Sequence, residues 1–279
     1  MKRTAVIGGD ERALRLALLL EKKGYTVNTL GLRQEEEPCP VEEAELLLFA
    51  YPYSSPGGMV PNLRGLSIEL DTVLARAKPG TCALLGEDWR NRLPSREWEE
   101  KGLRLLAYSQ DEGFLQTNTD ISAEGALCYA MKQLPCTISG CTHLVAGYGR
   151  FGRALALKLH ALGGRVKVAA RSEKAREQAR EDGLEAISLE ELPDALRRTR
   201  VFLNTVAAQV LGKDALRAVS KDALLMELAS APYGFDREEA EAMGLAVAFL
   251  PGIPGRYAPE SAAQALYDAM IRLTGGMSA

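Results

Sequence analysis

Residues 143–172 read HLVAGYGRFGRALALKLHALGGRVKVAARS, and this stretch decides the fold. The short apolar run 143–146 predicts a buried strand. A glycine-rich turn follows, then a pattern typical of an amphipathic helix over 150–162, and then a second apolar strand over 165–170. Strand, turn, helix and strand in this order form the unit from which doubly wound parallel sheets are built.

The turn between this strand and this helix has the pattern GxGxxG, as Gly147-Tyr148-Gly149-Arg150-Phe151-Gly152. The first glycine allows a tight turn, the second lets a diphosphate approach the backbone, and the third lets the helix pack close to the strand. The helix N-terminus offers free N–H groups and a partial positive charge to phosphate oxygens. In this context the motif predicts a dinucleotide site. The alternative is a glycine-rich turn in a Rossmann-like domain that binds no ligand.

The end of the second strand indicates which coenzyme binds. Sites for NAD usually carry Asp or Glu there, because a carboxylate accepts hydrogen bonds from the ribose 2′-OH. Here the strand ends in Arg171 and Ser172, with Lys174 close by, and these groups suit a 2′-phosphate. We therefore expect NADP(H), unless Arg171 is only a solvated strand-end residue. The segment that follows the next apolar run is expected to complete the coenzyme site with Asn204, Thr205 and Val206.

Further apolar runs alternate with helical patterns along the rest of the chain. Strands are predicted at 4–7, 25–30, 45–50, 82–86 and 103–108, and at 201–203, 224–226 and 246–250. This alternation predicts an α/β fold of two Rossmann-like, doubly wound parallel-sheet domains that are joined by long helices and have a cleft between them. The expected domains are a flavodoxin- or Rossmann-like substrate domain at 1–118 plus 256–279, and an NADP-binding Rossmann domain at 119–255.

Two long helices are predicted outside these repeats. The first, at 119–135, bridges the domains, with Thr119 or Asp120 as its N-cap. The second, at 260–273, is expected to return to the first domain beside the bridging helix. The first strand of the chain ends in Gly8-Gly9-Asp10, but the third glycine of the motif is missing and Asp10 would repel a phosphate. We interpret this turn as degenerate rather than as a second dinucleotide site.

Composition excludes several classes of protein. The chain has 279 residues, of which 47% are hydrophobic, and a formal net charge of −3. The apolar content is too high for a disordered chain, and the balanced charge disfavours broad nucleic-acid binding. No stretch reaches the roughly 18 apolar residues of a membrane helix, so we expect a cytoplasmic protein with neither a membrane nor a nucleic-acid partner.

The five cysteines show neither a CxxC pair nor the spacing of metal ligands, so no metal site is expected. An odd count in a chain of this length is typical of reduced cytosolic thiols rather than of a disulfide framework. These cysteines are Cys39, Cys82, Cys128, Cys136 and Cys141.

Candidate substrate residues follow the ends of predicted strands, because the carboxyl ends of parallel strands line the ligand crevice. Ser230 follows one strand, and Arg256 lies in a Pro- and Gly-rich loop at 251–259, where it is suited to hold a carboxylate. Thr119 and Ser122, at the predicted start of the bridging helix, form a candidate anion site. For Thr119 the alternative is capping alone.

No side chain is assigned as the catalytic acid or base. His143 lies in the strand before the glycine turn and His160 on the helix after it, and both are interpreted as packing or surface residues. Hydride transfer needs no protein nucleophile, because the cofactor carries the chemistry and the protein orients it.

Several motifs together resemble those of the larger polypeptide of dipicolinate synthase, the enzyme that makes pyridine-2,6-dicarboxylate. The more specific ones are Gly-Gly-Asp at 8–10 and Pro-Gly-Ile-Pro-Gly at 251–255. The resemblance spans nearly the whole chain. The matching stretches are 5–10 with Arg12, 118–125, 145–152, 163–172, 227–230, and 250–255 with 258–259.

The resemblance implies that the protein oxidises dihydrodipicolinate to dipicolinate with NADP+, together with the smaller, flavoprotein-like subunit of dipicolinate synthase, in the mother cell of a sporulating bacterium. A homodimer or larger assembly is expected. The two carboxylates of this substrate need two anion holders, for which Arg12, Arg256 and the helix start at Thr119 are candidates. The nicotinamide is expected over the substrate, between Thr205 and the segment that begins at Ser230.

Two alternatives stay open. The first is a protein that holds NADP without catalysis and supports a flavoprotein partner. The second is a 2-hydroxy acid dehydrogenase, a class that resembles Thr-Pro-His-Ile-Ala-Gly at its last strand and uses the histidine as acid and base. Here Leu250-Pro251-Gly252 stands in that place, without a histidine.

Overall fold

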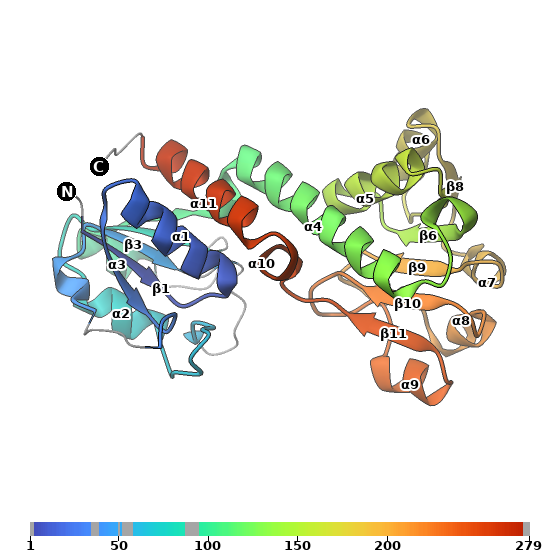
Figure 1. Cartoon of the computed structure of the whole chain (residues 1–279), viewed down its shortest axis with the longest axis horizontal. Coiled ribbons are helices and arrows are strands. Elements are labelled where there is room, and N and C mark those ends of the chain that lie inside the picture. Colours follow the sequence, from blue (N-terminus) through green and yellow to red (C-terminus); the bar gives the residue numbers. More distant parts are fainter. Residues whose placement is uncertain (1–2, 35–38, 50, 52–57, 87–94, 276–279) are drawn as a thin grey trace. The chain divides into compact units, whose positions relative to one another are not determined.

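The computed structural model of the chain describes residues 3–34, 39–49, 51, 58–86 and 95–275 (Figure 1). The chain divides into two compact units. Unit 1 consists of Met1–Asn118 and Pro254–Ala279, and unit 2 of Thr119–Ile253. Each unit is built around its own parallel sheet.

Unit 1 contains a five-stranded parallel sheet in the order β2-β1-β3-β4-β5, which is the flavodoxin-like order. Strand β3 begins one residue after the start predicted for 45–50, and residue 50 lies outside the described residues. The elements of unit 1 are β1 (Arg3–Ile7), α1 (Glu11–Lys22), β2 (Thr26–Leu30), the 3-10 helix η1 (Val41–Glu43), β3 (Leu46–Phe49), α2 (Leu70–Arg76), β4 (Cys82–Leu85), α3 (Ser95–Glu100), β5 (Arg104–Ala107), the 3-10 helix η4 (Tyr108–Gln110) and α11 (Pro259–Leu273).

Both faces of this sheet are buried, which explains the nearly unbroken apolar strands. In β3, Leu47 and Phe49 face a core formed with α2, whereas Leu46 and Leu48 face a second core formed with α1 and α11. The side chains of a strand alternate between its two faces, so each strand feeds both cores. Helix α11 packs on α1 within this unit, although the two are far apart in sequence (Figure 1).

Unit 2 contains a six-stranded parallel sheet in the order β11-β10-β9-β6-β7-β8. Counted from β6, this is the Rossmann order 3-2-1-4-5-6, in which the chain changes direction across the sheet between β6 and β9. The elements of unit 2 are the 3-10 helix η5 (Ile138–Gly140), β6 (Thr142–Ala146), α5 (Arg150–Ala161), β7 (Arg165–Ala169), α6 (Glu173–Glu181), β8 (Glu185–Ile187), α7 (Leu192–Leu196), β9 (Val201–Asn204), α8 (Lys213–Ala218), β10 (Leu224–Glu227), α9 (Arg237–Ala242) and β11 (Ala246–Phe249). The predicted fold class of two doubly wound parallel α/β sheets is confirmed.

The long helix predicted at 119–135 begins earlier than expected, because α4 covers Glu112–Gln133. Asp111 is its cap, since Oδ1 of Asp111 accepts a hydrogen bond of 2.6 Å from the backbone N–H of Phe114. The prediction that Thr119 or Asp120 caps this helix was wrong. Both residues lie in its interior, where backbone N–H groups are bonded to the preceding turn.

The segment after β11 is more ordered than a Pro- and Gly-rich loop. A short helix, α10 (Ile253–Tyr257), occupies the middle of the predicted loop 251–259, so that prediction was wrong in part. Pro254 lies in the first turn of α10, where a proline has no N–H to lose from helical bonding. Arg256 lies near the end of α10 and is exposed.

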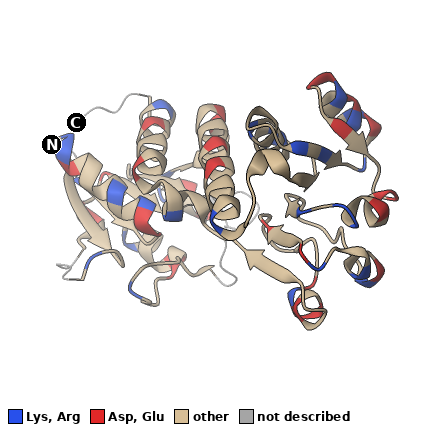
Figure 2. Ribbon diagram, turned by 45° about the vertical axis from the view of Figure 1, so that its right-hand side comes forward, with Lys and Arg blue, Asp and Glu red and all other residues tan. Residues whose placement is uncertain are grey.

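Cys136 and Cys141 form a disulfide in the connection between α4 and β6. The prediction of five reduced thiols was therefore wrong for this pair, whose spacing matches no common disulfide motif. Cys39, Cys82 and Cys128 are not disulfide-bonded. Acidic and basic residues are mixed along the helices of both units (Figure 2). No helix within the described ranges is both long and apolar enough to span a membrane.

Candidate functional site

The turn between β6 and α5 shows why two of its three glycines are required. Gly147 has a φ of 92°, and a Cβ atom there would lie 2.7 Å from both Thr205 and Val206. A Cβ atom at Gly152 would lie 2.2 Å from the backbone oxygen of Gly147. Both positions are therefore closed to larger side chains by the packing of the turn itself.

Gly149 differs from the other two because a Cβ atom there would meet nothing within 4 Å. The backbone of Gly149 thus faces open space, as a turn that receives a diphosphate must. The first backbone bond of α5 runs from the N–H of Arg153 to the oxygen of Gly149, at 2.9 Å. Phe151 and Gly152 precede Arg153 in the first turn of α5, where backbone N–H groups lack an acceptor within the helix and can bind phosphate oxygens. These residues fit a dinucleotide.

Three more of the predicted coenzyme residues, Tyr148, Arg150 and Phe151, lie in this turn or at the start of α5. The hydroxyl of Tyr148 donates to Oδ2 of Asp182 at 2.7 Å, and Arg153 binds the same carboxylate. The ring of Tyr148 is therefore held against the end of α6. Arg150 is exposed and Phe151 half-buried in the first turn of α5.

The end of β9 closes the turn from the neighbouring strand. Oγ1 of Thr205 donates to the backbone oxygen of Ala146 at 2.7 Å, so the segment after β9 is bonded to the end of β6. The amide of Asn204 forms two bonds to Val206, with Nδ2 donating to its oxygen at 2.9 Å and Oδ1 accepting from its N–H at 3.2 Å. The predicted residues Asn204, Thr205 and Val206 thus lie beside the glycine turn, at the point where the strand order reverses.

Glu227, at the end of β10, is a residue whose importance the sequence did not reveal. It is 1% exposed and accepts a hydrogen bond of 2.7 Å from Nδ2 of Asn204. It also accepts from the backbone N–H groups of Ala229, at 2.9 Å, and Gly234, at 2.7 Å. Burial raises the pKa of Glu227, and these donors oppose that effect. Ser230 lies in the turn that this carboxylate organises, and it is exposed.

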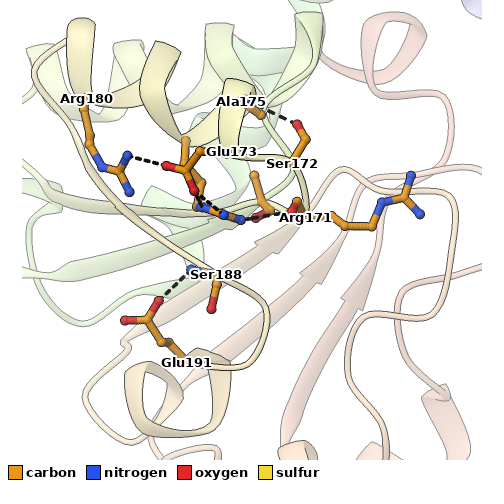
Figure 3. Close-up of polar contacts among 9 residues, drawn as sticks. Arg171, Ser172, Glu173, Ala175, Arg180, Ser188 and Glu191 are labelled. Carbon is orange, nitrogen blue, oxygen red and sulfur yellow. Dashed lines mark hydrogen bonds and ion pairs between the residues drawn. The ribbon is translucent and has the colours of Figure 1, made fainter.

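The end of β7 carries the residues predicted to recognise a 2′-phosphate. In Figure 3 the side chain of Arg171 extends away from α6, and its guanidinium makes no hydrogen bond or ion pair with the described residues. Ser172 caps α6, with Oγ accepting from the N–H of Ala175 at 3.3 Å. Lys174 is exposed in the first turn of α6. A free guanidinium, a hydroxyl and a helix N-terminus therefore follow the same strand.

Glu173 carries the carboxylate nearest to Arg171 in sequence, and both of its oxygens already accept hydrogen bonds from other arginines. Oε1 of Glu173 accepts from Arg180 at 2.8 Å, and Oε2 accepts from Nε of Arg176 at 3.1 Å (Figure 3). The hydrogen bond from Arg180, and after it the one from Arg176, lowers the pKa of the Glu173 carboxyl group. Arg176 also donates to the backbone oxygens of Ala170 and Arg171. Of these three described arginines, Arg171 is thus the one with a free guanidinium.

The first turn of the chain, at Gly8 and Gly9, does not offer the same space. A Cβ atom at Gly8 would lie 2.4 Å from Val60, and the N–H of Gly9 donates to the backbone oxygen of Pro61 at 2.6 Å. Val60 and Pro61 therefore pack directly against this turn.

The candidate substrate residues of unit 1 differ in their surroundings. Arg12 is buried, and its Nε and amino groups bind both carboxylate oxygens of Asp10 at 2.7–3.0 Å. Gly255 packs on the same carboxylate, since a Cβ atom there would lie 2.3 Å from Oδ2 of Asp10. Arg256 is exposed and makes no hydrogen bond or ion pair with the described residues.

Thr119 and Ser122 belong to the part of α4 that lies in unit 2, and both are half-buried. They do not stand at a helix N-terminus, so the anion site predicted from that position is not present there. The cause is the cap at Asp111, which places the free N–H groups of α4 in its first turn.

The two histidines do not lie at the carboxyl edge of the unit 2 sheet. His143 is close to the start of β6, fully buried, with Nε2 3.0 Å from the backbone oxygen of Ile138. Burial lowers the pKa of His143. His160 is exposed in the last turn of α5, at the opposite end of that helix from the glycine turn. Within the described residues no group of three or more His, Cys, Asp or Glu is placed to hold a metal ion.

Comparison with known proteins finds a similar family for each part of the chain. Residues 3–86 match the family model of the N-terminal domain of the dipicolinate synthase A subunit. The A subunit of dipicolinate synthase from Bacillus subtilis (strain 168) is 25% identical over 287 residues, which cover 99% of this chain and 96% of that protein. The chain is similar to the dipicolinate synthase A subunit over almost its whole length. The resemblance stated from the motifs is thereby confirmed.

Solved structures agree with this relationship. The crystal structure of the dipicolinate synthase A subunit from Bacillus halodurans is 25% identical, with a TM-score of 0.83 over 98% of this chain and 97% of that chain. The corresponding structure from Bacillus subtilis is 24% identical, with a TM-score of 0.80 over 98% and 96%. Residues 114–233 match the family model of the D-isomer specific 2-hydroxyacid dehydrogenase, NAD binding domain. Unit 2 therefore carries a dehydrogenase-like domain for a nicotinamide coenzyme.

Proposed function

We propose that this relative of the dipicolinate synthase A subunit oxidises dihydrodipicolinate to dipicolinate with NADP+. It would work with a second, flavoprotein-like subunit in the mother-cell cytoplasm during sporulation. The dihydropyridine ring loses a hydride to NADP+ and a proton to solvent, so the products are an aromatic ring and NADPH. The single observation that carries this proposal is the open backbone at Gly149, followed by the first turn of α5. The family relationship supplies the substrate.

The choice of NADP over NAD rests on charge at the end of β7. A ribose 2′-OH is usually recognised by a free carboxylate, and the carboxylate of Glu173 is occupied by Arg176 and Arg180. Recognition of a 2′-phosphate requires free donors, and Arg171 offers them. The hydroxyl of Ser172 and the charge of Lys174 add to this preference.

The substrate carries two carboxylates, and we assign Arg256 to one of them. Its guanidinium is exposed and free of described partners, whereas that of Arg12 is neutralised by Asp10. We assign Arg12 to the support of Asp10 and, through it, of the segment at Gly255. In this proposal unit 1 is the substrate domain and unit 2 is the coenzyme domain.

Bound NADP+ would supply the hydride acceptor, and the residues of unit 2 would hold its diphosphate and 2′-phosphate. Formation of an aromatic ring makes loss of the hydride favourable, so the reaction needs no strong base. Neither histidine lies at the carboxyl edge of the sheet, which disfavours a 2-hydroxy acid dehydrogenase that relies on an imidazole there. The match of residues 114–233 to the coenzyme domain of that class reflects the shared coenzyme fold.

The direct test mixes the purified chain with dihydrodipicolinate and NADP+, with and without the flavoprotein-like partner, and follows NADPH by its absorbance. We expect NADPH to form in the mixture that contains both proteins. Coenzyme binding without NADPH formation in either mixture would indicate the alternative of a non-catalytic NADP-binding protein. Formation of NADPH from a 2-hydroxy acid instead would indicate the dehydrogenase alternative.

A further inference from the structure

Glu227 is a buried carboxylate that accepts hydrogen bonds and has no cationic partner among the described residues. Oε1 accepts from Nδ2 of Asn204 and from the N–H of Ala229, and Oε2 accepts from the N–H of Gly234. Every one of these partners is a donor. Several N–H donors favour the ionised form of a carboxylate, because a protonated oxygen would need an acceptor, and here they oppose the rise in pKa that burial causes.

This one carboxylate fixes two turns. Through Asn204 it sets the turn after β9, since the same amide group of Asn204 is bonded twice to Val206. Through Gly234 it sets the turn after β10. A Cβ atom at Gly234 would lie 2.3 Å from Nδ2 of Asn204, so the two turns are packed together with no room for a side chain between them. The residues Glu227 and Asn204 are direct partners in the parallel register of β10 and β9.

The position of Glu227 in the sheet indicates which half of a bound dinucleotide would lie near it. In the order β11-β10-β9-β6-β7-β8 the dinucleotide lies across the ends of the strands, with its diphosphate at the β6 turn. Arg171, after β7, marks the side of the 2′-phosphate and hence of the adenosine. The nicotinamide half then belongs on the side of β9 and β10. The nicotinamide ring has a positive charge when oxidised and none when reduced.

We propose that Glu227 is a positioning residue for the nicotinamide half of the coenzyme, and that its negative charge favours binding of the oxidised over the reduced form. The carboxylate orders the turn at Asn204 and supplies a buried negative charge on this side of the site. The inference rests on the proposed coenzyme function. It adds a reason for the site to prefer the oxidised coenzyme, because a fixed negative charge in a poorly solvated site strongly attracts the positively charged nicotinamide ring.

The test compares dissociation constants for NADP+ and NADPH, measured by calorimetry at pH 8, for the wild type, Glu227→Gln and Glu227→Asp. In Glu227→Gln we expect the Kd for NADP+ to rise about fivefold or more relative to the Kd for NADPH, because the charge is lost at nearly constant volume. In Glu227→Asp both constants should rise together while their ratio stays near that of the wild type, because the charge is kept and the turn is loosened.

Circular dichroism and thermal unfolding show whether each variant folds. If Glu227→Gln does not fold, Glu227→Asp still tests the proposal, since a changed ratio of the Kd for NADP+ to the Kd for NADPH in that variant would contradict it. Equal shifts of both constants in Glu227→Gln would leave Glu227 with a structural role alone and would overturn the proposal. A wild type that binds neither coenzyme would instead contradict the proposed function itself.

Discussion

The backbone oxygen of Gly147 occupies the position in which a Cβ atom of Gly152 would stand, at a separation of 2.2 Å. Gly149, between them, has open space at the corresponding point. Gly147 and Gly152 are thus required by the packing of the turn itself, whereas Gly149 leaves room for a bound ligand.

Substitutions at these glycines should separate folding from coenzyme binding. Gly152→Ala should lower the free energy of unfolding by about 1–3 kcal/mol, because the added methyl group collides with backbone. Gly149→Ala should lower stability less than Gly152→Ala, since φ there is −78° and the space is open, and only the N-cap position of α5 loses a better residue. It should raise the Kd for coenzyme about tenfold or more, because the methyl group meets the diphosphate. Urea unfolding and calorimetric titration of both variants measure these effects. Equal coenzyme affinity in Gly149→Ala would argue against a diphosphate at this turn.

Arg171→Ala should weaken the binding of NADP+ and leave that of NAD+ unchanged. The lost charge-assisted hydrogen bonds are worth about 1.5–3 kcal/mol, or roughly 10- to 150-fold in Kd. Arg217→Ala is a matched control, because Arg217 is also an exposed arginine of unit 2, paired with Asp214 on α8. Parallel titrations with both coenzymes give the selectivity. A variant at position 171 that kept the selectivity of the wild type would remove Arg171 from the coenzyme site.

Arg256→Ala should raise KM for dihydrodipicolinate about tenfold or more while leaving the Kd for NADP+ within about twofold, because a carboxylate loses its bidentate partner. Arg76→Ala serves as control, since Arg76 is an exposed arginine of the same unit that pairs with Glu42. Steady-state kinetics with the assembled enzyme provide KM. An unchanged KM in the Arg256 variant would exclude this residue from substrate binding.

Asp111 and Asp120 provide a direct comparison for the start of α4. Asp111→Ala should lower the free energy of unfolding by about 2 kcal/mol, because it removes both the helix cap and the bonds to Arg272. Asp120→Ala should change it by less than about 0.5 kcal/mol, since Asp120 lies inside the helix, 3.5 Å from Lys158. Chemical denaturation measures both. The reverse ranking would place the cap where the sequence suggested it.

Stability should fall in mild acid because of His143. Burial lowers the pKa of this imidazole in the folded state below its ordinary value of about 6.5. The stabilisation is therefore fully present above pH ~6.5 and is lost as the pH falls from there through the folded-state value, by up to about 1.4 kcal/mol per pH unit. Urea unfolding between about pH 8 and pH 5 should show this loss, and His143→Gln should reduce it. A wild type and a variant with the same pH dependence would exclude His143 as its source.

The strands and the glycine turn were predictable because their signals are local. Apolar runs bounded by glycine mark most strands, and the spacing of Gly147, Gly149 and Gly152 depends on one turn only. Strand β8 was missed because it has three residues and begins with the exposed Glu185. The start of α4 was placed too late because Gly113 and the Thr-Asn-Thr run after it are weak helix formers, and the cap at Asp111 draws strength from a residue 161 positions away.

The role of Glu227 depends on tertiary structure. Asn204 and Glu227 each end an apolar strand, and that is the one signal in the sequence. It becomes informative only when β9 and β10 are known to be neighbours in register. The disulfide between Cys136 and Cys141 was missed for a related reason, because their meeting depends on the path of the connection from α4 to β6.

The most direct measurement is a calorimetric titration of the purified wild-type chain with NADPH and with NADH, using Gly149→Ala as the reference for a blocked diphosphate site. We expect NADPH to bind at least about tenfold more tightly than NADH, and Gly149→Ala to weaken both. Failure of the wild type to bind either coenzyme would contradict the assignment of unit 2 as a dinucleotide-binding domain, and a preference for NADH would contradict the role of Arg171.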